Sequence, residues 1–544
     1  MAKGMGLNTI ATYIFWNFHE KEGKTLDFTS PDRNLRNYIK IIQEEGMYLL
    51  IRPGPYVCGE WDLGGLPSRL LSIDNIRLRC SDPRYLREVE DYVAQVADIL
   101  REFQVTNGGP ILMLQIENEY GSYSNDRDYL DFLQKLWRKH GITVPFYTAD
   151  GAWVTNWENS IKMGSIENAG VGVDPGVEAT PYEAAQKIRP GALIFSAETY
   201  PGWMTHWGES YQGKETARVQ PEVEFLLKNG KSFNLYVIHG GTNFGFSAGS
   251  NCDDSNGFQP QITSYDYDAP INEQGSPTEK YFMIRDLIAK YTNKSIPNPP
   301  ENIKMISFGE VEVKPFATIW DNLPKETKVA QPRPMEYFGQ NSGIILYRSN
   351  LRDIKSGQLK IKDLHDYGLI FEDDKLIDVG DRMVSAQKSV ELSPTQNESK
   401  KLEILVEAFG RINFGEYYHD RKGITNYVLL DGITLSTWSV YNLDLNYETY
   451  ISKLKESQNF EKEGVFFKFI VNLPEVGDTY LNLENFKKGI VWANGYNLGR
   501  YWDKGPQTKL FWPGCWMRKG ENEIIILDLH KKTSGKISGG KSLH

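Results

Sequence analysis

The sequence predicts a parallel (β/α) barrel in its first half, followed by two all-β domains. Apolar segments of strand length alternate with amphipathic helices as far as residue 295, and this alternation favours a parallel sheet. A proline-rich linker follows at Ile296–Pro300. Beyond it, helical periodicity gives way to short alternating segments typical of strands. At 544 residues, the chain is long enough for about three domains.

The barrel strands are predicted from apolar runs that follow amphipathic helices. A helix that Asp32 can cap stops at Gly46 and leads to a strand. A second helix opens at Asp82 and leads to the strand that begins at Ile111. The same pattern continues along the chain, and the predicted strands cover residues 8–16, 48–51, 111–116, 144–147, 164–167, 192–196 and 233–238.

These segments amount to about seven strands, whereas a complete (β/α)8 or TIM barrel has eight. Residues 1–6 resemble the last turn of a helix already under way. We therefore expect a chain truncated at an internal methionine, with its first strand missing. The missing upstream part would also carry any export signal of a secreted or periplasmic protein. An irregular barrel is the alternative.

Beyond the linker, the pattern predicts two β-sandwich or jelly-roll domains. Apolar residues alternate with Glu403 and Glu407 around residue 404, and Asn494-Gly495 predicts a tight hairpin. The predicted domains are 1–295 for the barrel, 296–450 for the first β-sandwich and 451–530 for the jelly roll. The Lys-, Ser- and Gly-rich segment 531–544 is predicted to be a flexible tail.

Composition narrows the classes of partner. The formal net charge of -10 and the pI near 5.5 argue against nucleic acid or an anionic membrane surface, which attract clustered Lys and Arg. No apolar run approaches the roughly 20 residues of a membrane span. The four cysteines are scattered and form neither a disulfide framework nor a metal-binding motif. A neutral ligand is expected, with no cofactor and no metal.

Two of the predicted strands end in a glutamate, Glu119 and Glu198. An isolated carboxylate at such a place is more often a helix cap or a surface residue, but a second one of the same kind favours chemistry. On the strand count, Glu198 lies three strands after Glu119, so both would point into one mouth of the barrel. Glycoside hydrolysis needs such a pair. A separation of about 5 Å retains anomeric configuration and roughly 6.5–9.5 Å inverts it, and sequence spacing leaves both outcomes open.

Longer segments make the resemblance specific: the chain resembles β-galactosidases of glycoside hydrolase family 35. The resemblance spans almost the whole chain. In the barrel it rests on Gly6–Glu20, Arg52–Pro67, Gly109–Tyr123, Ser196–Gly208, Tyr236–Gly245 and Thr263–Pro270, and in the β region on Ile404–Gly415, His419–Gly423 and Ile490–Trp502.

The resemblance implies a retaining mechanism in which Glu119 is the acid/base and Glu198 the nucleophile. It also implies that Asn118 holds the sugar 2-hydroxyl group, and that Tyr236 could donate to Glu198. The implied galactose-contacting positions are Tyr13, Gly59, Glu60, Tyr236 and Tyr267. Core packing is the alternative for the tyrosines, and a buried salt bridge is the alternative for Glu60. Gly59 stands where family members commonly have Ala.

The expected function is that of an exo-acting β-galactosidase, which removes terminal non-reducing β-D-galactose from oligo- or polysaccharides by double displacement. The last domain is expected to be a galactose-binding-like jelly roll. Two alternatives are kept: an exo-β-glycosidase of another specificity, such as a glucosaminidase, and an inactive remnant that only binds carbohydrate. The expected partner is the galactoside substrate.

Overall fold

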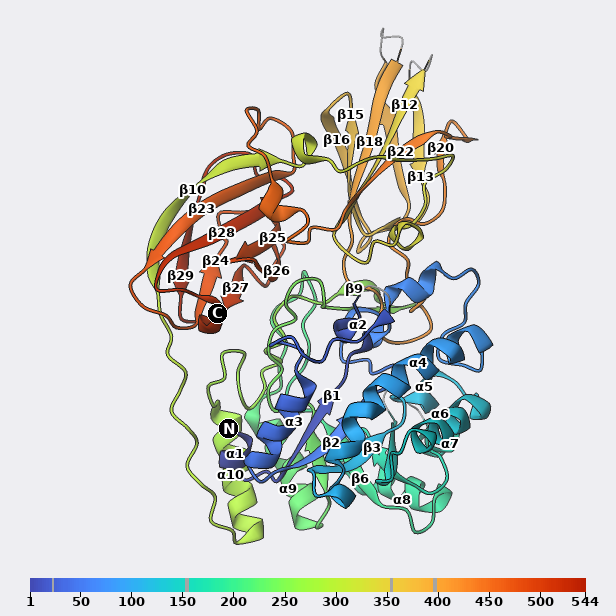
Figure 1. The fold of residues 1–544 in the computed structure, drawn as a ribbon, viewed down its shortest axis with the longest axis vertical. Helices are drawn as coiled ribbons and strands as arrows, with labels where there is room; N and C mark the ends of the chain where they lie inside the picture. The colour runs from blue at the N-terminus through green and yellow to red at the C-terminus, as the bar shows by residue number, and fades with distance from the viewer. Residues whose placement is uncertain (22–23, 152–155, 353–355, 395–398) are drawn as a thin grey trace.

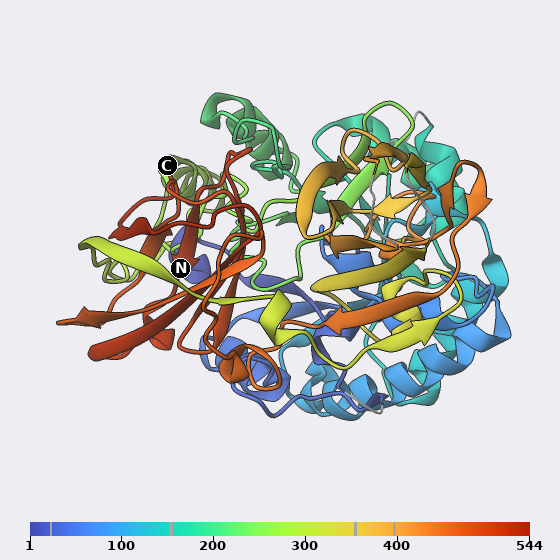
Figure 2. The ribbon, with the colours of Figure 1, turned by 90° about the horizontal axis from the view of Figure 1, so that it is seen from above.

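The computed structural model describes residues 1–21, 24–151, 156–352, 356–394 and 399–544. The chain forms a (β/α) body and two all-β bodies that lie over one end of it (Figure 1). Seen from above, the two all-β bodies lie side by side (Figure 2). This arrangement confirms the predicted fold class.

The barrel sheet has seven strands, parallel throughout and in chain order from β1 to β7. Within the described residues, β1 and β7 are the two edges and do not pair with each other. The strands are β1 (Thr9–Tyr13), β2 (Tyr48–Arg52), β3 (Ile111–Gln115), β4 (Phe146–Asp150), β5 (Ala169–Val173), β6 (Ile194–Thr199) and β7 (Phe233–Leu235).

The fifth strand is displaced from its predicted position. Residues 164–167 do not form it; instead, the strand is Ala169–Val173, after a helix that ends at Gly164. The true strand contains Gly170 and Gly172, which weaken its sequence signal. Its glycines serve packing, because a Cβ atom added at Gly172 would lie 2.4 Å from the Cβ atom of Ala197 on β6.

Helices surround the sheet (Figure 1). Asn34 caps α3 by accepting a hydrogen bond from the Asn37 backbone; Asp32 lies too far upstream to serve as the predicted cap. Asp82 caps α4 as predicted. None of the helices in the described ranges is long and apolar enough to cross a membrane. The helices are α1 (Ala2–Met5), α2 (Trp16–His19), α3 (Leu35–Glu44), α4 (Pro83–Leu100), α5 (Tyr120–Tyr123), α6 (Arg127–Lys139), α7 (Trp157–Gly164), α8 (Ala179–Ile188), α9 (Thr216–Lys228) and α10 (Glu279–Thr292).

The first all-β body packs a six-stranded sheet against a four-stranded one around a shared apolar core. The six-stranded order is β11-β22-β12-β18-β15-β16, and the four-stranded order is β17-β13-β20-β21. The strands are β11 (Thr327–Val329), β12 (Ile344–Arg352), β13 (Gly357–Ile361), β15 (Tyr367–Glu372), β16 (Lys375–Asp381), β17 (Lys388–Leu392), β18 (Ser399–Glu407), β20 (Val428–Leu430), β21 (Ile433–Thr434) and β22 (Trp438–Leu443). Two further sheets have two strands each. One pairs β8 (Ser250–Asp253) with β9 (Gly257–Pro260), and the other pairs β14 (Leu364–His365) with β19 (Gly423–Ile424).

The second all-β body contains an eight-stranded sheet in the order β26-β25-β28-β23-β10-β29-β24-β27. Its β25–β26 hairpin turns at Asn494 and Gly495, both with positive φ (48° and 91°), which confirms the hairpin predicted from this pair. The strands are β10 (Phe308–Thr318), β23 (Val465–Leu473), β24 (Thr479–Asn482), β25 (Lys488–Ala493), β26 (Tyr496–Trp502), β27 (Lys509–Trp512), β28 (Gly520–Asp528) and β29 (Gly535–Gly540).

Two segments lie elsewhere than the sequence predicts. Strand β10, expected in the first all-β domain, pairs with β23 and β29 of the second. The expected flexible tail forms β29, which pairs with β10 and β24. Glycine explains the close packing there, because a Cβ atom at Gly539 would lie 2.3 Å from the Phe308 ring. Both segments are fixed by partners far away in the sequence, and composition does not reveal such partners.

A buried arginine joins the first all-β body to the barrel. The Arg411 guanidinium group lies 3.1 Å from a carboxylate oxygen of Asp62 on the barrel side and 2.6 Å from one of Glu336. The Arg411 and Glu336 side chains are almost fully buried. Removing the cation would leave two carboxylates without their main partner in a region of low dielectric constant.

We therefore expect Arg411→Leu to lower the free energy of unfolding by about 3–5 kcal/mol, as measured by urea unfolding. Lys536→Ala is the matched control, because it breaks the exposed ion pair between Lys536 and Glu310 and should leave the unfolding midpoint unchanged. A similar midpoint for Arg411→Leu and Lys536→Ala would contradict the anchoring role of Arg411.

Candidate active site

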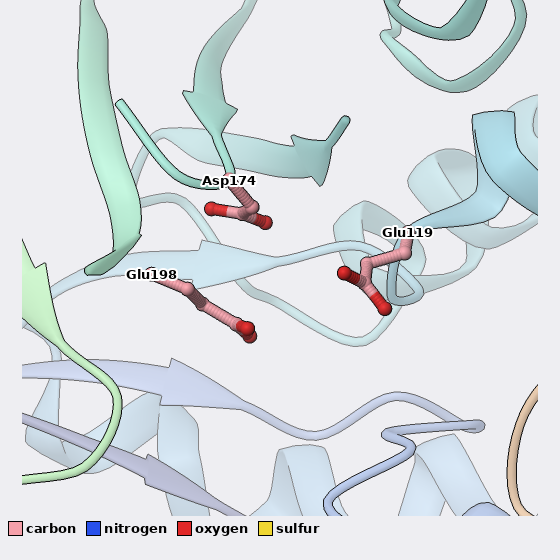
Figure 3. A group of neighbouring side chains, drawn as sticks. All are labelled: Glu119, Asp174 and Glu198. Atoms are coloured by element: carbon pink, nitrogen blue, oxygen red, sulfur yellow. The ribbon is translucent and has the colours of Figure 1, made fainter. Parts of the chain in front are cut away.

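The two glutamates lie at the same end of the barrel sheet. Glu198 is on β6, and Glu119 follows β3 at the start of α5. Both side chains are buried. Carboxyl oxygens of the two residues lie within 4.8 Å of each other, and their side chains point toward one another (Figure 3). Glu198 lies three strands after Glu119 along the sheet, as the strand count predicts.

A buried salt bridge holds the backbone that carries Glu119. Arg79 donates to both carboxylate oxygens of Glu117, at 2.9 and 2.8 Å, and to the Asn118 carbonyl at 2.9 Å. Glu117 and Glu119 both have left-handed backbone conformations, with φ of 57° and 46°. Such conformations are costly for residues other than glycine and persist where surrounding contacts fix them. The backbone N–H of Glu119 also donates to the Ala149 carbonyl of β4, at 3.0 Å.

Glu198 is surrounded by donors. Arg52, at the end of β2, forms a buried ion pair with its Oε1 atom. Tyr13 donates to the same oxygen at 3.4 Å, and Tyr200 donates to Oε2 at 3.2 Å. The expectation that Tyr236 serves Glu198 is wrong: its hydroxyl group donates to Glu60 at 2.9 Å.

Glu119 has the opposite environment. Its one side-chain hydrogen bond comes from Asn118 Nδ2 at 3.4 Å, within the described residues. Burial raises the pKa of Glu119 well above the ordinary value, the negative charges of Glu198 and Glu60 raise it further, and Arg52 opposes them. Such an environment favours the protonated form of the carboxyl group, which can then act as an acid.

A single pocket contains all eight residues singled out from the sequence. Its wall includes Tyr13, Gly59, Glu60, Asn118, Glu119, Glu198, Tyr236 and Tyr267. Among the described residues, the hydroxyl groups of Tyr236 and Tyr265 donate to the Glu60 carboxylate. These contacts differ from the buried salt bridge that was the alternative for Glu60. Burial raises the pKa of Glu60, and these two hydroxyl groups partly offset the effect. A Cβ atom at Gly59 would lie 3.2 Å from the Phe15 ring, so glycine leaves room for that ring.

Other residues of the pocket were not found from the sequence. Tyr200 lines the pocket, and Arg52 contacts Glu198 and Asn118 without belonging to the lining. Both lie at strand ends within segments that carry the family resemblance, and these positions could have indicated them. Phe414 comes from a loop of the first all-β body and lies within Ile404–Gly415, a segment that carries the family resemblance, but its distance from Glu198 in the sequence gives no sign that it reaches the pocket. The remaining lining residues are Cys58, Trp203, Met204 and Asn251.

Comparison with known proteins gives a consistent result along the chain. Residues 1–291 match Glycosyl hydrolases family 35. Residues 332–444 match the first all-beta domain of beta-galactosidase, and residues 464–522 match its galactose-binding domain.

Three curated relatives show the extent of the similarity. A beta-galactosidase of Xanthomonas manihotis is 35% identical over 94% of this chain and 84% of its own length. Beta-galactosidase 8 of Oryza sativa subsp. japonica is 34% identical over 97% of this chain and 86% of its own length. The beta-galactosidase of Homo sapiens is 33% identical, over 97% and 81%.

The raised pKa of Glu119 has a consequence for stability. The folded state binds this proton more tightly than the unfolded state, so the stabilisation is complete below the unfolded-state pKa of about 4.3 and is lost as pH rises through the folded-state pKa. Glu119→Gln stays neutral at every pH. At pH 4, we expect the variant and the wild type to have the same free energy of unfolding. At pH 7, we expect that of the variant to be higher by about 1 kcal/mol or more.

Urea unfolding at several pH values between 4 and 8 measures this difference. Glu310→Gln, at an exposed carboxylate, is the control and should give a difference that does not grow with pH. If the difference in free energy of unfolding between Glu119→Gln and the wild type stays constant over this range, the pKa of Glu119 is not raised in the folded state.

Proposed function

The chain belongs to glycosyl hydrolases family 35, and we propose that it is an exo-acting β-galactosidase that releases terminal non-reducing β-D-galactose with retention of configuration. The observation that carries this proposal is the buried pair Glu119 and Glu198, with carboxyl oxygens within 4.8 Å of each other. Retaining enzymes bring their two carboxyl groups to about 5–5.5 Å, whereas inverting enzymes keep them roughly 6.5–9.5 Å apart to admit a water molecule.

In the first step, a carboxylate oxygen of Glu198 attacks the anomeric carbon of the bound galactoside. The bond from that carbon to the leaving oxygen breaks, and Glu119 gives its proton to this oxygen. Arg52, Tyr13 and Tyr200 hold the Glu198 carboxylate group in place for the attack. A galactosyl ester on Glu198 results, and the negative charge has moved to Glu119.

In the second step, Glu119 takes a proton from water, and the water oxygen attacks the anomeric carbon. The ester bond to Glu198 breaks and restores its carboxylate group. Two inversions give net retention. The loss of charge from Glu198 on esterification removes a main cause of the raised Glu119 pKa, so Glu119 becomes a carboxylate when it must act as a base.

The rest of the pocket suits a single terminal sugar. Asn118 Oδ1 accepts from Arg52 at 2.7 Å and from Gln115 at 2.9 Å, and this arrangement orients the side-chain amide beside the catalytic pair. We assign Asn118 to the 2-hydroxyl group, a contact that strengthens in the transition state. Glu60, Tyr236 and Tyr267 supply polar groups for the other hydroxyl groups. Trp203 and Phe414 also line the pocket, and such a pocket favours a chain end over an internal unit.

A 2-deoxy-2-fluorogalactoside with a good leaving group tests the nucleophile. The fluorine slows both steps and the leaving group rescues the first, so the ester accumulates. We expect one fluorogalactosyl unit per chain, located by peptide mass spectrometry on Glu198. Glu198→Ala is the control and should take up none. A folded wild-type protein without an adduct would favour the remnant that only binds carbohydrate.

Glu119→Ala tests the acid. We expect kcat/KM for an alkyl β-galactoside to fall by about 10²–10⁴-fold, because its leaving oxygen needs a proton. The fall should be much smaller for 2,4-dinitrophenyl β-galactoside, whose leaving group departs as an anion. Equal losses on both substrates would argue against the acid role.

Substrate specificity is tested on the wild type. Faster hydrolysis of a matched β-glucosaminide than of the β-galactoside would refute the proposed specificity.

A further inference from the structure

The mechanism leaves unexplained one buried carboxyl group that lies beside the two glutamates. Asp174 directly follows β5 and is fully buried. One of its oxygens lies within 4.8 Å of oxygens of both Glu119 and Glu198. Figure 3 shows the three carboxyl groups converging from three strand ends, with Asp174 beside the space between the two glutamates.

Asp174 differs from Glu198 in its lack of donors. Neither of its oxygens has a hydrogen-bond partner within the described ranges, whereas Glu198 accepts from an arginine and two tyrosines. An ionised carboxylate that is buried without donors is strongly disfavoured. Burial, followed by the charges of Glu198 and Glu119, raises the pKa of Asp174 well above its ordinary value.

The surroundings offer Asp174 little positive charge. Arg52 is the cation that acts on it most directly, and this guanidinium group already binds Glu198 and Asn118. Asp150, on the neighbouring strand β4, adds a further carboxyl group whose own pKa burial raises to about 8. The titratable and charged groups that face Asp174 are Arg52, Glu119, Tyr147, Asp150, Tyr182, Glu198 and Tyr200.

We propose that Asp174 is a positioning residue whose protonated carboxyl group donates a hydrogen bond to whichever of Glu119 and Glu198 carries the negative charge. This inference rests on the proposed function. The charge is on Glu198 in the free enzyme and on Glu119 in the galactosyl ester, and Asp174 lies close to both. The oxygens lie within 4.8 Å, so the proposed hydrogen bond requires the Asp174 side chain to rotate toward its acceptor. Asp174 keeps its proton throughout, so the proton balance of both steps is unchanged.

Infrared spectroscopy tests the protonation state without relying on activity. The difference spectrum between the wild type and Asp174→Asn at pH 7 should show the loss of one C=O stretch of a protonated carboxyl group. Its absence would mean that Asp174 is ionised and would overturn the proposal. A loss of activity with EDTA that a divalent cation restores would overturn it as well, because chelation needs the ionised form.

Kinetics on two substrates test the role. Asp174→Leu should lower kcat/KM about 10–100-fold for an alkyl β-galactoside, because a hydrogen bond to the charge that develops on Glu119 is lost. The loss should be several-fold smaller for 2,4-dinitrophenyl β-galactoside, since Glu119 then keeps its proton. Asp174→Asn, which retains an N–H donor, should stay within about threefold of the wild type on both.

Asp150→Asn is the matched control, since it alters a buried carboxyl group one strand away that accepts from the Gly121 backbone. A merely structural effect lowers both substrates equally, and that result for Asp174→Leu would overturn the proposal. A wild-type protein inactive on both galactosides would overturn the proposed function instead, whatever the infrared spectrum shows of Asp174.

Discussion

The ion pair between Arg52 and Glu198 is the interaction on which the pocket depends. Several carboxyl groups are buried at one mouth of the barrel, and their mutual repulsion has to be balanced. Arg52 is 3% exposed, binds Glu198 and Asn118, and lies with its guanidinium carbon 4.4 Å from the centre of the Tyr13 ring. One cation thus contacts the proposed nucleophile Glu198, the Asn118 amide beside Glu119 and an aromatic ring of the wall. Among the described residues, Glu119 has no such partner and its pKa is raised by burial and by the neighbouring carboxylates, so two chemically similar glutamates stand in different environments.

The strands that lead to Glu119 and Glu198 could be predicted from the sequence, because each is a run of apolar residues that stops at a polar one. Strands β3 and β6 show this plainly, and their glutamates were found for the same reason. Strand β5 was misplaced because Gly170 and Gly172 dilute its apolar character, and Asp174 at its end was missed with it. Local pattern also failed for β10 and β29, since each strand is determined by pairing with a distant segment.

The proposed galactose-contacting residues were singled out through resemblance to a family, and the structure adds how their side chains are held. The Tyr236 hydroxyl group donates its hydrogen bond to Glu60 and not to Glu198, and residue type alone does not decide between the two acceptors. Contacts from outside the barrel were out of reach for the same reason. The loop after β18 brings Phe414 to the pocket wall, Arg411 to Asp62, and the Asn413 carbonyl to the Tyr56 hydroxyl group.

Because this loop lies far along the chain, the parts of the pocket are synthesised at different times. During synthesis, the N-terminal part of a chain emerges and folds first. Both glutamates and Arg52 leave the ribosome within the first 200 residues, but the wall that Phe414 completes and the anchor at Arg411 come about 200 residues later. A nascent barrel therefore carries both glutamates in a pocket that still lacks the part of its wall formed by Phe414. The pocket wall is therefore complete only after the first all-β body has docked, although the residues singled out from the sequence all belong to the barrel.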